Sequence, residues 1–552
     1  MQTLGLLCAF VVWAFSAQTA EPPSPATVEG EVVNRLTGTP VKSAHVIYTR
    51  TDAGSGASLP SSTDTDLQGH FHLQLAPGSY RLWVERSGFA RQLYGALSPA
   101  GEGTALVLAP GQQVHRLMFR MVPLGAIAGH VFDEDGEPFQ NAGIQVLRFS
   151  YPGGHRELLS VAGASSNDRG EYRVFGLPAA RYLVLASPPG APLSHSNDGA
   201  ALVPEVQDAY AALYYPGVLD ADSASVVALP EGGDLADIDF QLRKVRTTTV
   251  RGRLLSPIGR FSASQNQVVL AHNERDSASY IDRASAAVDP ATGRFEIHGV
   301  APGSYLLAAS QLSGAYVASG RAAVELSPST PPQEFTVALT PAFEITGVVE
   351  VEGAPRGTFP GFIVRLAPAE ELAPGPRPWS KVGADGGIRL TGVTPGLWTL
   401  LMDSFPEGLW LKSATFGDTD IVAGELNIKE GVPGQLRITL AGNGARISGT
   451  VTAAGRPCRA TVVLAPAAIE LRGSRQMYRV TNTGERGAFS LKGVRPGSYK
   501  LFAFQEIEAF AWFDPELLRI VESLGDSVSV DAGEVALRDL VAIPPETLTP
   551  SR

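Results

Sequence analysis

The sequence predicts an all-β protein that consists of five tandem antiparallel β-sandwiches. Two sequence motifs, each of which occurs five times, support this prediction. The first is a turn with proline and an aromatic residue, and the second is a glycine followed two places later by an aliphatic residue. The glycines are separated by 99, 123, 95 and 102 residues and the turn prolines by 101, 124, 93 and 101. Because the two spacings drift together, a unit of about 100 residues, the size of one sandwich, recurs. The turns are Ala76–Tyr80, Leu177–Tyr182, Ala301–Tyr305, Thr394–Trp398 and Arg495–Tyr499, and the glycines are Gly30, Gly129, Gly252, Gly347 and Gly449.

Each proline turn is predicted to close a β-hairpin. Proline favours the second position of a type II turn, and glycine supplies the positive φ of the third. An alternating segment such as Gly69–Leu73 precedes the turn, and another, Tyr80–Glu85, follows it. Alternation of apolar and polar residues is typical of a half-buried strand. The other preceding segments are Gly170–Val174, Gly293–Ile297, Gly387–Leu390 and Gly487–Leu491.

A closing strand is predicted at the end of each unit. In the first of these, Gln113–Met121, alternation places His115 on the same face as Leu117 and Phe119. The later closing strands are Asp237–Leu242, Glu334–Leu339, Gln435–Leu440 and Leu537–Ile543. The predicted domains are therefore 26–123, 124–246, 247–341, 342–442 and 443–543.

The second unit contains an insertion at 188–222, within which Val206–Leu213 is a possible helix. Long loops on a rigid sandwich often carry function, so this insertion is a candidate binding surface. The alternative is a lid that only covers an open sheet edge.

A short helix is expected near the C-terminus. Asp514 is a good N-cap and Pro515 suits the first helical position. Four apolar residues then fall on one helical face, which we expect to pack on the last sandwich. They are Leu517, Leu518, Val521 and Leu524.

The N-terminus indicates export. Leu4–Ala17 is almost entirely apolar and is followed by small residues, a pattern typical of a signal peptide, here residues 1–20. An uncleaved anchor is the alternative. No other stretch is long and apolar enough to span a membrane, so the mature chain is expected in the periplasm, on the outer surface or outside the cell.

The distribution of charge argues against a nucleic-acid partner. The net charge is −11 and the 44 basic residues are scattered, whereas nucleic-acid binding needs a concentrated basic face. We therefore expect no nucleic-acid partner.

Beyond the signal peptide Cys458 is the single cysteine, so no internal disulfide can form. We interpret it as a buried thiol, with a nucleophile as the alternative.

The repeated motifs resemble the carboxypeptidase regulatory-like domain. The resemblance rests on the Gly-x-Val opening, on Gly-x-Pro-x-x-x-Ala at Gly38–Ala44, on Gly-x-Phe/Tyr and on Pro-Gly-Ser-Tyr. The family implies a transthyretin-like, prealbumin β-sandwich, grouped with carbohydrate-binding-like folds and with Cna B-type domains. All five units match, and the closing features resemble secreted multi-repeat members from soil bacteria. The second unit departs from the pattern, since Ala179-Ala180 stands in place of Gly-Ser.

The sequence predicts no enzyme, catalytic residue, metal or cofactor. In the metallocarboxypeptidases this domain accompanies a zinc enzyme, but here no segment has the length or the His-x-x-Glu pattern of one. His70 and His72 have a spacing that can chelate a metal, although a solvent-facing strand explains them. Asp133–Gly136 is similar to a calcium loop but lacks its later ligands, and a polar turn is the simpler interpretation.

Three function hypotheses remain. The first is a non-enzymatic protein with a structural, adhesive or scaffolding role at the cell envelope, in contact with envelope proteins or carbohydrate. The second is a glycan-binding protein that stacks sugars on Trp83, Trp379 or Trp512; the alternative for these rings is core or inter-domain packing. The third is a hydrolase with a cryptic site in the insertion 188–222.

Overall fold

The computed structural model describes residues 24–52, 59–96, 103–151, 157–189, 206–259, 261, 266–272, 284–313, 316–327, 334–353, 361–368, 377–403, 408–429, 434–484 and 486–548. The predicted signal peptide and part of the insertion, 190–205, lie outside these residues. The chain divides into two compact units, 1–123 and 124–552, which are described separately. Within the described ranges no helix has the length and hydropathy needed to cross a membrane. We use the predicted ranges to name the first to fifth repeats.

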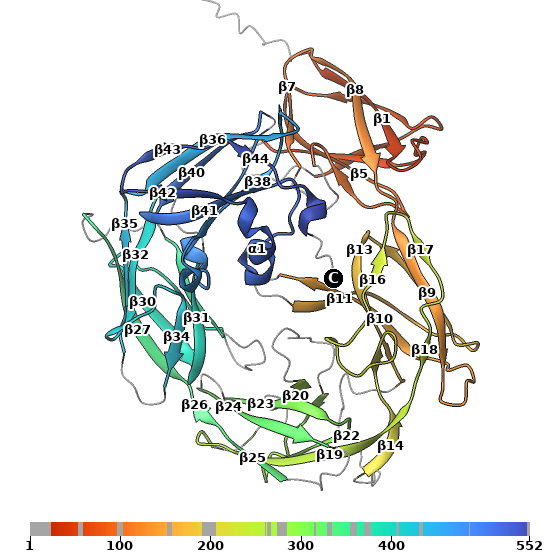
Figure 1. The fold of residues 1–552 in the computed structure, drawn as a ribbon, viewed down its shortest axis with the longest axis vertical. Coiled ribbons are helices and arrows are strands. Elements are labelled where there is room, and N and C mark those ends of the chain that lie inside the picture. The colour runs from red at the N-terminus through yellow and green to blue at the C-terminus, as the bar shows by residue number, and fades with distance from the viewer. Residues whose placement is uncertain are drawn as a thin grey trace, which may run out of the picture. The chain divides into compact units, whose positions relative to one another are not determined.

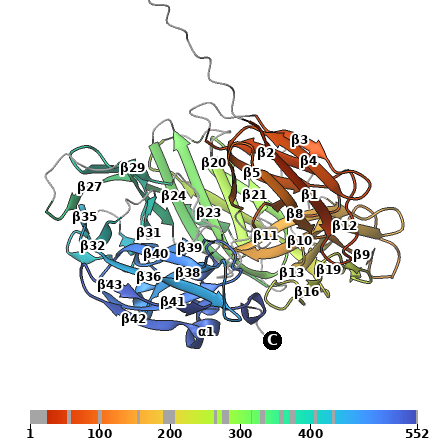
Figure 2. The ribbon, with the colours of Figure 1, turned by 90° about the horizontal axis from the view of Figure 1, so that it is seen from above.

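The first repeat is a sandwich of two sheets (Figure 2). One sheet has the order β4-β1-β8, and the other has the order β3-β2-β5-β6, with β7 also on β5. Their inner faces enclose a cluster of apolar residues between Ala26 and Met121. The strands are β1 (Ala26–Asn34), β2 (His45–Arg50), β3 (Ser61–Asp64), β4 (His70–Leu75), β5 (Gly78–Glu85), β6 (Gln92–Leu93), β7 (Ala105–Leu108) and β8 (Gln113–Met121).

The second and third repeats have the same two-sheet plan. The second comprises β9 (Gly125–Phe132), β10 (Gly143–Ser150), β11 (Glu157–Ser165), β12 (Glu171–Leu177), β13 (Ala180–Ser187), β14 (Val206–Tyr210), β15 (Leu213–Tyr214), β16 (Val227–Leu229), β17 (Asp234–Leu235) and β18 (Phe240–Gln241). The third comprises β19 (Lys244–Leu255), β20 (Asn266–His272), β21 (Ala284–Ala286), β22 (Arg294–Val300), β23 (Gly303–Ser313), β24 (Tyr316–Leu326), β25 (Glu334–Ala338) and β26 (Thr340–Pro341).

The fourth and fifth repeats complete the chain (Figure 1). The fourth comprises β27 (Phe343–Val351), β28 (Ile363–Pro368), β29 (Trp379–Lys381), β30 (Gly387–Val393), β31 (Gly396–Asp403), β32 (Trp410–Phe416), β33 (Thr419–Asp420), β34 (Glu425–Ile428) and β35 (Leu436–Ala441). The strands of the fifth are β36 (Ala445–Ala453), β37 (Arg456–Pro457), β38 (Thr461–Pro466), β39 (Arg479–Asn482), β40 (Ala488–Val494), β41 (Gly497–Phe504), β42 (Asp526–Val530), β43 (Val535–Leu537) and β44 (Leu540–Val541). Its helices are the 3₁₀ helices η2 (Ile469–Leu471), η3 (Arg475–Met477), η4 (Ala511–Phe513), η5 (Glu522–Leu524) and η6 (Pro545–Leu548) and the α-helix α1 (Pro515–Val521).

The proline turn does not close a hairpin, so this prediction is wrong. In every repeat the strand before the turn lies in one sheet and the strand after it lies in the other, as for β4 and β5. In three repeats the backbone at the turn glycine also departs from a type II turn. Gly78, Gly396 and Gly497 have φ of 156°, 149° and 150°, far from the value near +80° of a type II turn. The chain therefore crosses between the layers as an extended corner.

The closing strand of each repeat lies parallel to the opening strand, which adds one parallel pair to an otherwise antiparallel sandwich. β1 pairs with β8 in this way, and β27 pairs with β35. In the second and fifth repeats the closing strand consists of two short pieces, β17 with β18 and β43 with β44, and it begins before the predicted ranges 237–242 and 537–543. In β8 a positive φ of 62° at Arg116 shifts the register. His115 is consequently exposed while Leu117 is buried, contrary to the prediction.

The described part of the insertion forms strands and a cover, and the helix expected at Val206–Leu213 is absent. Val206–Tyr210 is the strand β14, which pairs with β19, the opening strand of the third repeat. Tyr214 and Ala221 then pack against the outer side of the sheet that contains β10, β11 and β13, whereas Leu213 is buried in the core between the two sheets. This arrangement favours the lid interpretation for 206–222.

The short helix near the C-terminus is confirmed. The Asp514 carboxylate accepts a hydrogen bond of 2.8 Å from the Glu516 amide, and α1 follows from Pro515. Leu518 and Val521 are buried against Phe502 and Phe504 of β41, and both ribbon views show α1 beside this strand (Figures 1 and 2). Leu524 is 49% exposed because the chain tightens into η5 after Val521, so it does not join the predicted face.

Apolar clusters lie separately within the repeats. Two residues of the fifth repeat break this pattern: Met477 is buried in the cluster of the fourth repeat, and Leu471 is partly buried against it. The all-β sandwich fold is thus confirmed, whereas the division into five domains at the predicted boundaries stays a prediction.

Candidate functional site

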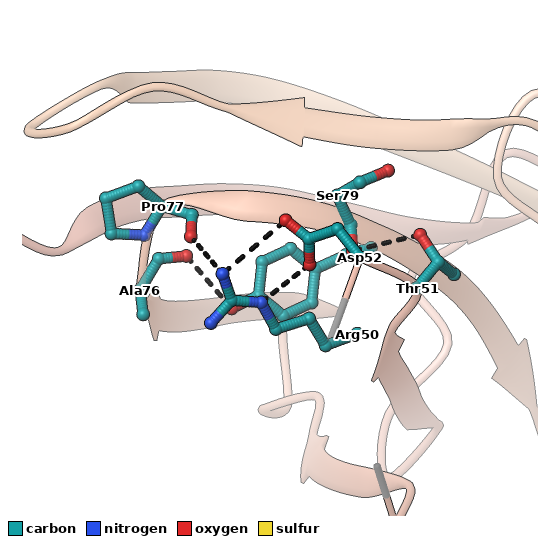
Figure 3. A network of polar contacts seen from close by, with 7 residues as sticks. Arg50, Thr51, Asp52, Ala76, Pro77 and Ser79 are labelled. Atoms are coloured by element: carbon teal, nitrogen blue, oxygen red, sulfur yellow. Dashed lines mark hydrogen bonds and ion pairs between the residues drawn. The ribbon is translucent and has the colours of Figure 1, made fainter. Parts of the chain in front are cut away.

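The aromatic residue of the turn motif is hydrogen-bonded to the corner that it follows, at the Ala76 carbonyl labelled in Figure 3. The Tyr80 hydroxyl donates a hydrogen bond of 2.9 Å to the carbonyl of Ala76, four residues earlier. The Arg50 guanidinium donates to the carbonyl of Pro77 at 2.9 Å and to the Asp52 carboxylate at 2.6 Å. A Cβ at position 78 would lie 2.8 Å from Arg50 Nε, so the glycine lets this pair approach the corner.

The corner bond recurs in all five repeats. It joins Tyr182 to Pro178 at 2.6 Å, Tyr305 to Ala301 at 2.9 Å, Trp398 to Thr394 at 2.9 Å and Tyr499 to Arg495 at 2.7 Å. Burial raises the pKa of Tyr80, Tyr182 and Tyr499 above its ordinary value, which keeps these hydroxyls protonated as donors. The second repeat keeps the bond although alanines replace its Gly-Ser.

The opening glycine lies directly opposite the aromatic or aliphatic residue of the Gly-x-Phe marker. Gly30 pairs with Phe71, and a Cβ on Gly30 would lie 2.4 Å from the Phe71 ring and 2.2 Å from the Leu117 carbonyl. The glycine therefore makes room for the ring and for the closing strand. The equivalent pairs are Gly129 with Tyr172, Gly252 with Phe295, Gly347 with Ile388 and Gly449 with Phe489. The sequence pattern did not predict these contacts.

The three candidate tryptophans have different surroundings. Trp83 is half-buried on the outer side of β5, and its indole N–H donates to Glu85 at 3.0 Å. Trp512 is half-buried between Phe510 and Phe513, with ring centroids 5.9 and 6.0 Å away, which favours packing. Trp379, on the edge strand β29, is 62% exposed. Of the three tryptophans, Trp379 is thus the most accessible to a ligand.

The histidines of β4 face solvent. His70 lies 3.7 Å from Asp66, and His72 lies 3.5 Å from Glu29. His115, displaced outward by the shift at Arg116, reaches the other oxygen of Glu29 at 2.9 Å. The hydrogen bond from His115 is the main cause of the lowered pKa of Glu29. Among the residues that the structure describes, no group of three or more acidic, histidine or cysteine side chains could hold a metal ion.

The acidic segment Asp133–Gly136 is a polar turn. The Asp133 carboxylate accepts hydrogen bonds of 2.9 Å from the amides of Asp135 and Glu137. Glu134 forms an ion pair with Lys244, the first residue of β19, which continues into the third repeat, and this contact lowers the pKa of Glu134 to about 2. The turn therefore helps to connect the two repeats.

Cys458 is partly buried at the end of β37, and burial raises the pKa of its thiol. A raised thiol pKa disfavours the thiolate that a nucleophile requires.

Comparison with known proteins bears on the first repeat. Residues 27–121 match the model of the carboxypeptidase regulatory-like domain. The resemblance inferred from the motifs is confirmed for this repeat. No curated protein matches the chain.

Solved structures similar to the chain include several bacterial pilins. A streptococcal ancillary pilin is 13% identical, with a TM-score of 0.21; the match covers 57% of this chain and 99% of that one. The TIE protein of Bacillus anthracis is 12% identical, with a TM-score of 0.15 and coverage of 77% and 75%. BcpA, the major pilin subunit of Bacillus cereus, is 12% identical, with a TM-score of 0.15 and coverage of 58% and 99%.

Proposed function

We propose that the chain is an exported, non-enzymatic protein of tandem sandwiches with a structural, adhesive or scaffolding role at the cell envelope. One observation carries this proposal: the residues that recur in every repeat serve packing. The corner aromatic bonds to its own turn, and the opening glycine packs against the closing strand. Repeated residues that stabilise the sandwich and leave its surface free to vary are what a structural module requires.

Two measurements on the full chain in a bacterial host test this proposal. We expect fractionation to find the chain in the periplasm, on the cell surface or in the medium, and retention in the cytoplasm would refute export. We also expect the purified protein to turn over none of a broad panel of esters, peptides and glycosides. Turnover would favour the hydrolase hypothesis and direct attention to the insertion 188–222.

Glycan binding is the second candidate function, and the exposure of Trp379 favours it. An exposed indole offers an apolar face on which the C–H face of a sugar ring can stack, whereas the half-buried rings of Trp83 and Trp512 offer less surface. Of the three tryptophans, Trp379 is therefore the one to vary first.

A further inference from the structure

Trp379 shares one face of its sheet with Arg365. The two residues lie directly opposite each other on the antiparallel strands β29 and β28. Their neighbours Val364 and Leu366 are buried in the core, so Arg365 lies on the outer face. Side chains directly opposite on neighbouring strands lie on the same side and in reach of each other. The indole and the guanidinium therefore flank one surface.

Arg365 is held in a fixed orientation by Asp403 of the adjacent strand β31. Its guanidinium donates to both carboxylate oxygens, at 2.5 and 3.2 Å. The side chains are 33% and 45% exposed, so solvent reaches both. A guanidinium has five N–H donors, of which this pair uses two. The pair thus presents rigid, partly exposed polar groups beside an exposed ring.

The surface around this pair is basic. Lys381, two residues after Trp379 on β29, is exposed. Arg475 of η3 has its guanidinium over the Phe513 ring, 5.4 Å from the centroid. Burial is the main cause that lowers the pKa of Arg475 to about 10; the nearby Arg365 lowers it further and Asp403 raises it. Arg475 is therefore still cationic at neutral pH. Among the described residues named here, three cations and one carboxylate leave an excess of positive charge, in a chain whose net charge is −11.

We propose that Trp379, Arg365 and Asp403, with Lys381 and Arg475 beside them, bind a sugar ring that carries a carboxylate, as in an acidic polysaccharide. The ring stacks its C–H face on the indole, its hydroxyls bond to the Arg365–Asp403 pair, and its carboxylate meets the excess positive charge. This site deepens the proposed envelope function and rests on it.

A protein partner fits this surface less well. A stable protein interface buries about 800 Å² on each partner around an apolar centre. Here one exposed ring is bordered by charged side chains. One apolar face with a polar rim is the chemistry of a single sugar ring.

The test is calorimetric titration of the full chain with two ligands. One is a hexauronate, the oligogalacturonate of six residues, and the other is the neutral maltohexaose. We expect the hexauronate to bind and the neutral sugar to bind at least about tenfold more weakly. Trp379→Ala should weaken hexauronate binding by about tenfold or more, and Trp379→Phe should weaken it less. Raising the salt from about 50 to 500 mM should also weaken it.

Trp83→Ala is the matched control, since it removes the half-buried indole of β5 and should leave binding unchanged. Because Trp379 is exposed, its alanine variant should melt as the parent does. Equal binding of the neutral sugar, no binding of the hexauronate, or full binding by Trp379→Ala would each overturn the site. None of these results alters cellular location or lack of turnover, which test the envelope function separately.

Discussion

Single glycines decide whether a repeat can close. Gly449 has the least room of the opening glycines, because a Cβ there would lie 1.8 Å from the Arg538 carbonyl. A backbone carbonyl of the closing strand cannot move away without disturbing the parallel pair of β36 with β43 and β44. Glycine is thus required at this position because of the closing strand, which lies about 90 residues further along the chain.

Gly449→Ala should lower the free energy of unfolding of the fifth repeat by about 3 kcal/mol or more, because the methyl group overpacks a backbone contact. The measurement is urea unfolding. Gly484→Ala in the same repeat is the control: its Cβ would meet nothing within 4 Å, so we expect a change within about 0.5 kcal/mol. Similar losses in both variants would contradict this account.

The corner tyrosines make stability depend on pH in the alkaline range. Burial raises the pKa of folded Tyr499 above its ordinary value of 10. The unfolded chain therefore ionises first, so the contribution of Tyr499 is complete below about pH 10 and is lost as the pH rises through the folded pKa.

Tyr499→Phe should cost about 1 kcal/mol at neutral pH, because the Arg495 carbonyl loses its donor. The variant should also show a shallower fall of melting temperature than the parent between about pH 9 and 11.5, measured by thermal unfolding. An unchanged slope would show that Tyr499 does not contribute to the alkaline loss.

At the scale of elements, the segment from η2 to β39 joins the fourth and fifth repeats. Met477 is 3% exposed and packs in the apolar cluster of the fourth repeat. Beside it, the Gln476 side chain donates to the Leu400 carbonyl at 3.3 Å, and Arg479 donates to the Leu409 carbonyl at 3.1 Å. A core residue of one repeat is thus supplied by the next.

Met477→Ala should destabilise by about 2 to 5 kcal/mol and should affect both repeats, because it leaves a cavity in the core of the fourth. Hydrogen exchange should become faster in β31 as well as in β38. Ile469→Ala, in the same segment at a side chain 72% exposed, is the control and should change neither strand. Faster exchange in β38 alone would mean that the repeats do not share a core.

Across the whole molecule, the first and fourth repeats differ in how far each supplies its own core. The first ends at Pro123 and contains its own two sheets and apolar cluster. The core of the fourth repeat, by contrast, includes Met477, which belongs to the fifth repeat.

We therefore expect residues 24–123 alone to fold and to melt within about 5 °C of the corresponding transition in the full chain. Residues 342–442 alone should melt lower than in the full chain, since the space filled by Met477 is left empty. Circular dichroism melting of both fragments provides the comparison. An unfolded first fragment, or an unshifted second one, would contradict this view of the two repeats.

The period, the sandwich class and the capped helix at Pro515 follow from the sequence alone, because alternation, turn chemistry and N-caps act within a few residues. The proline motif also predicts where each corner lies, but it does not predict that the chain crosses from one sheet to the other there. Which strand pairs with which depends on contacts distant in the sequence, so the tertiary structure decided that Gly449 faces Phe489 and that Met477 enters another core. The same holds for the tryptophans: a ring on a strand is exposed or buried according to what packs on it, and only the fold left Trp379 exposed beside Arg365.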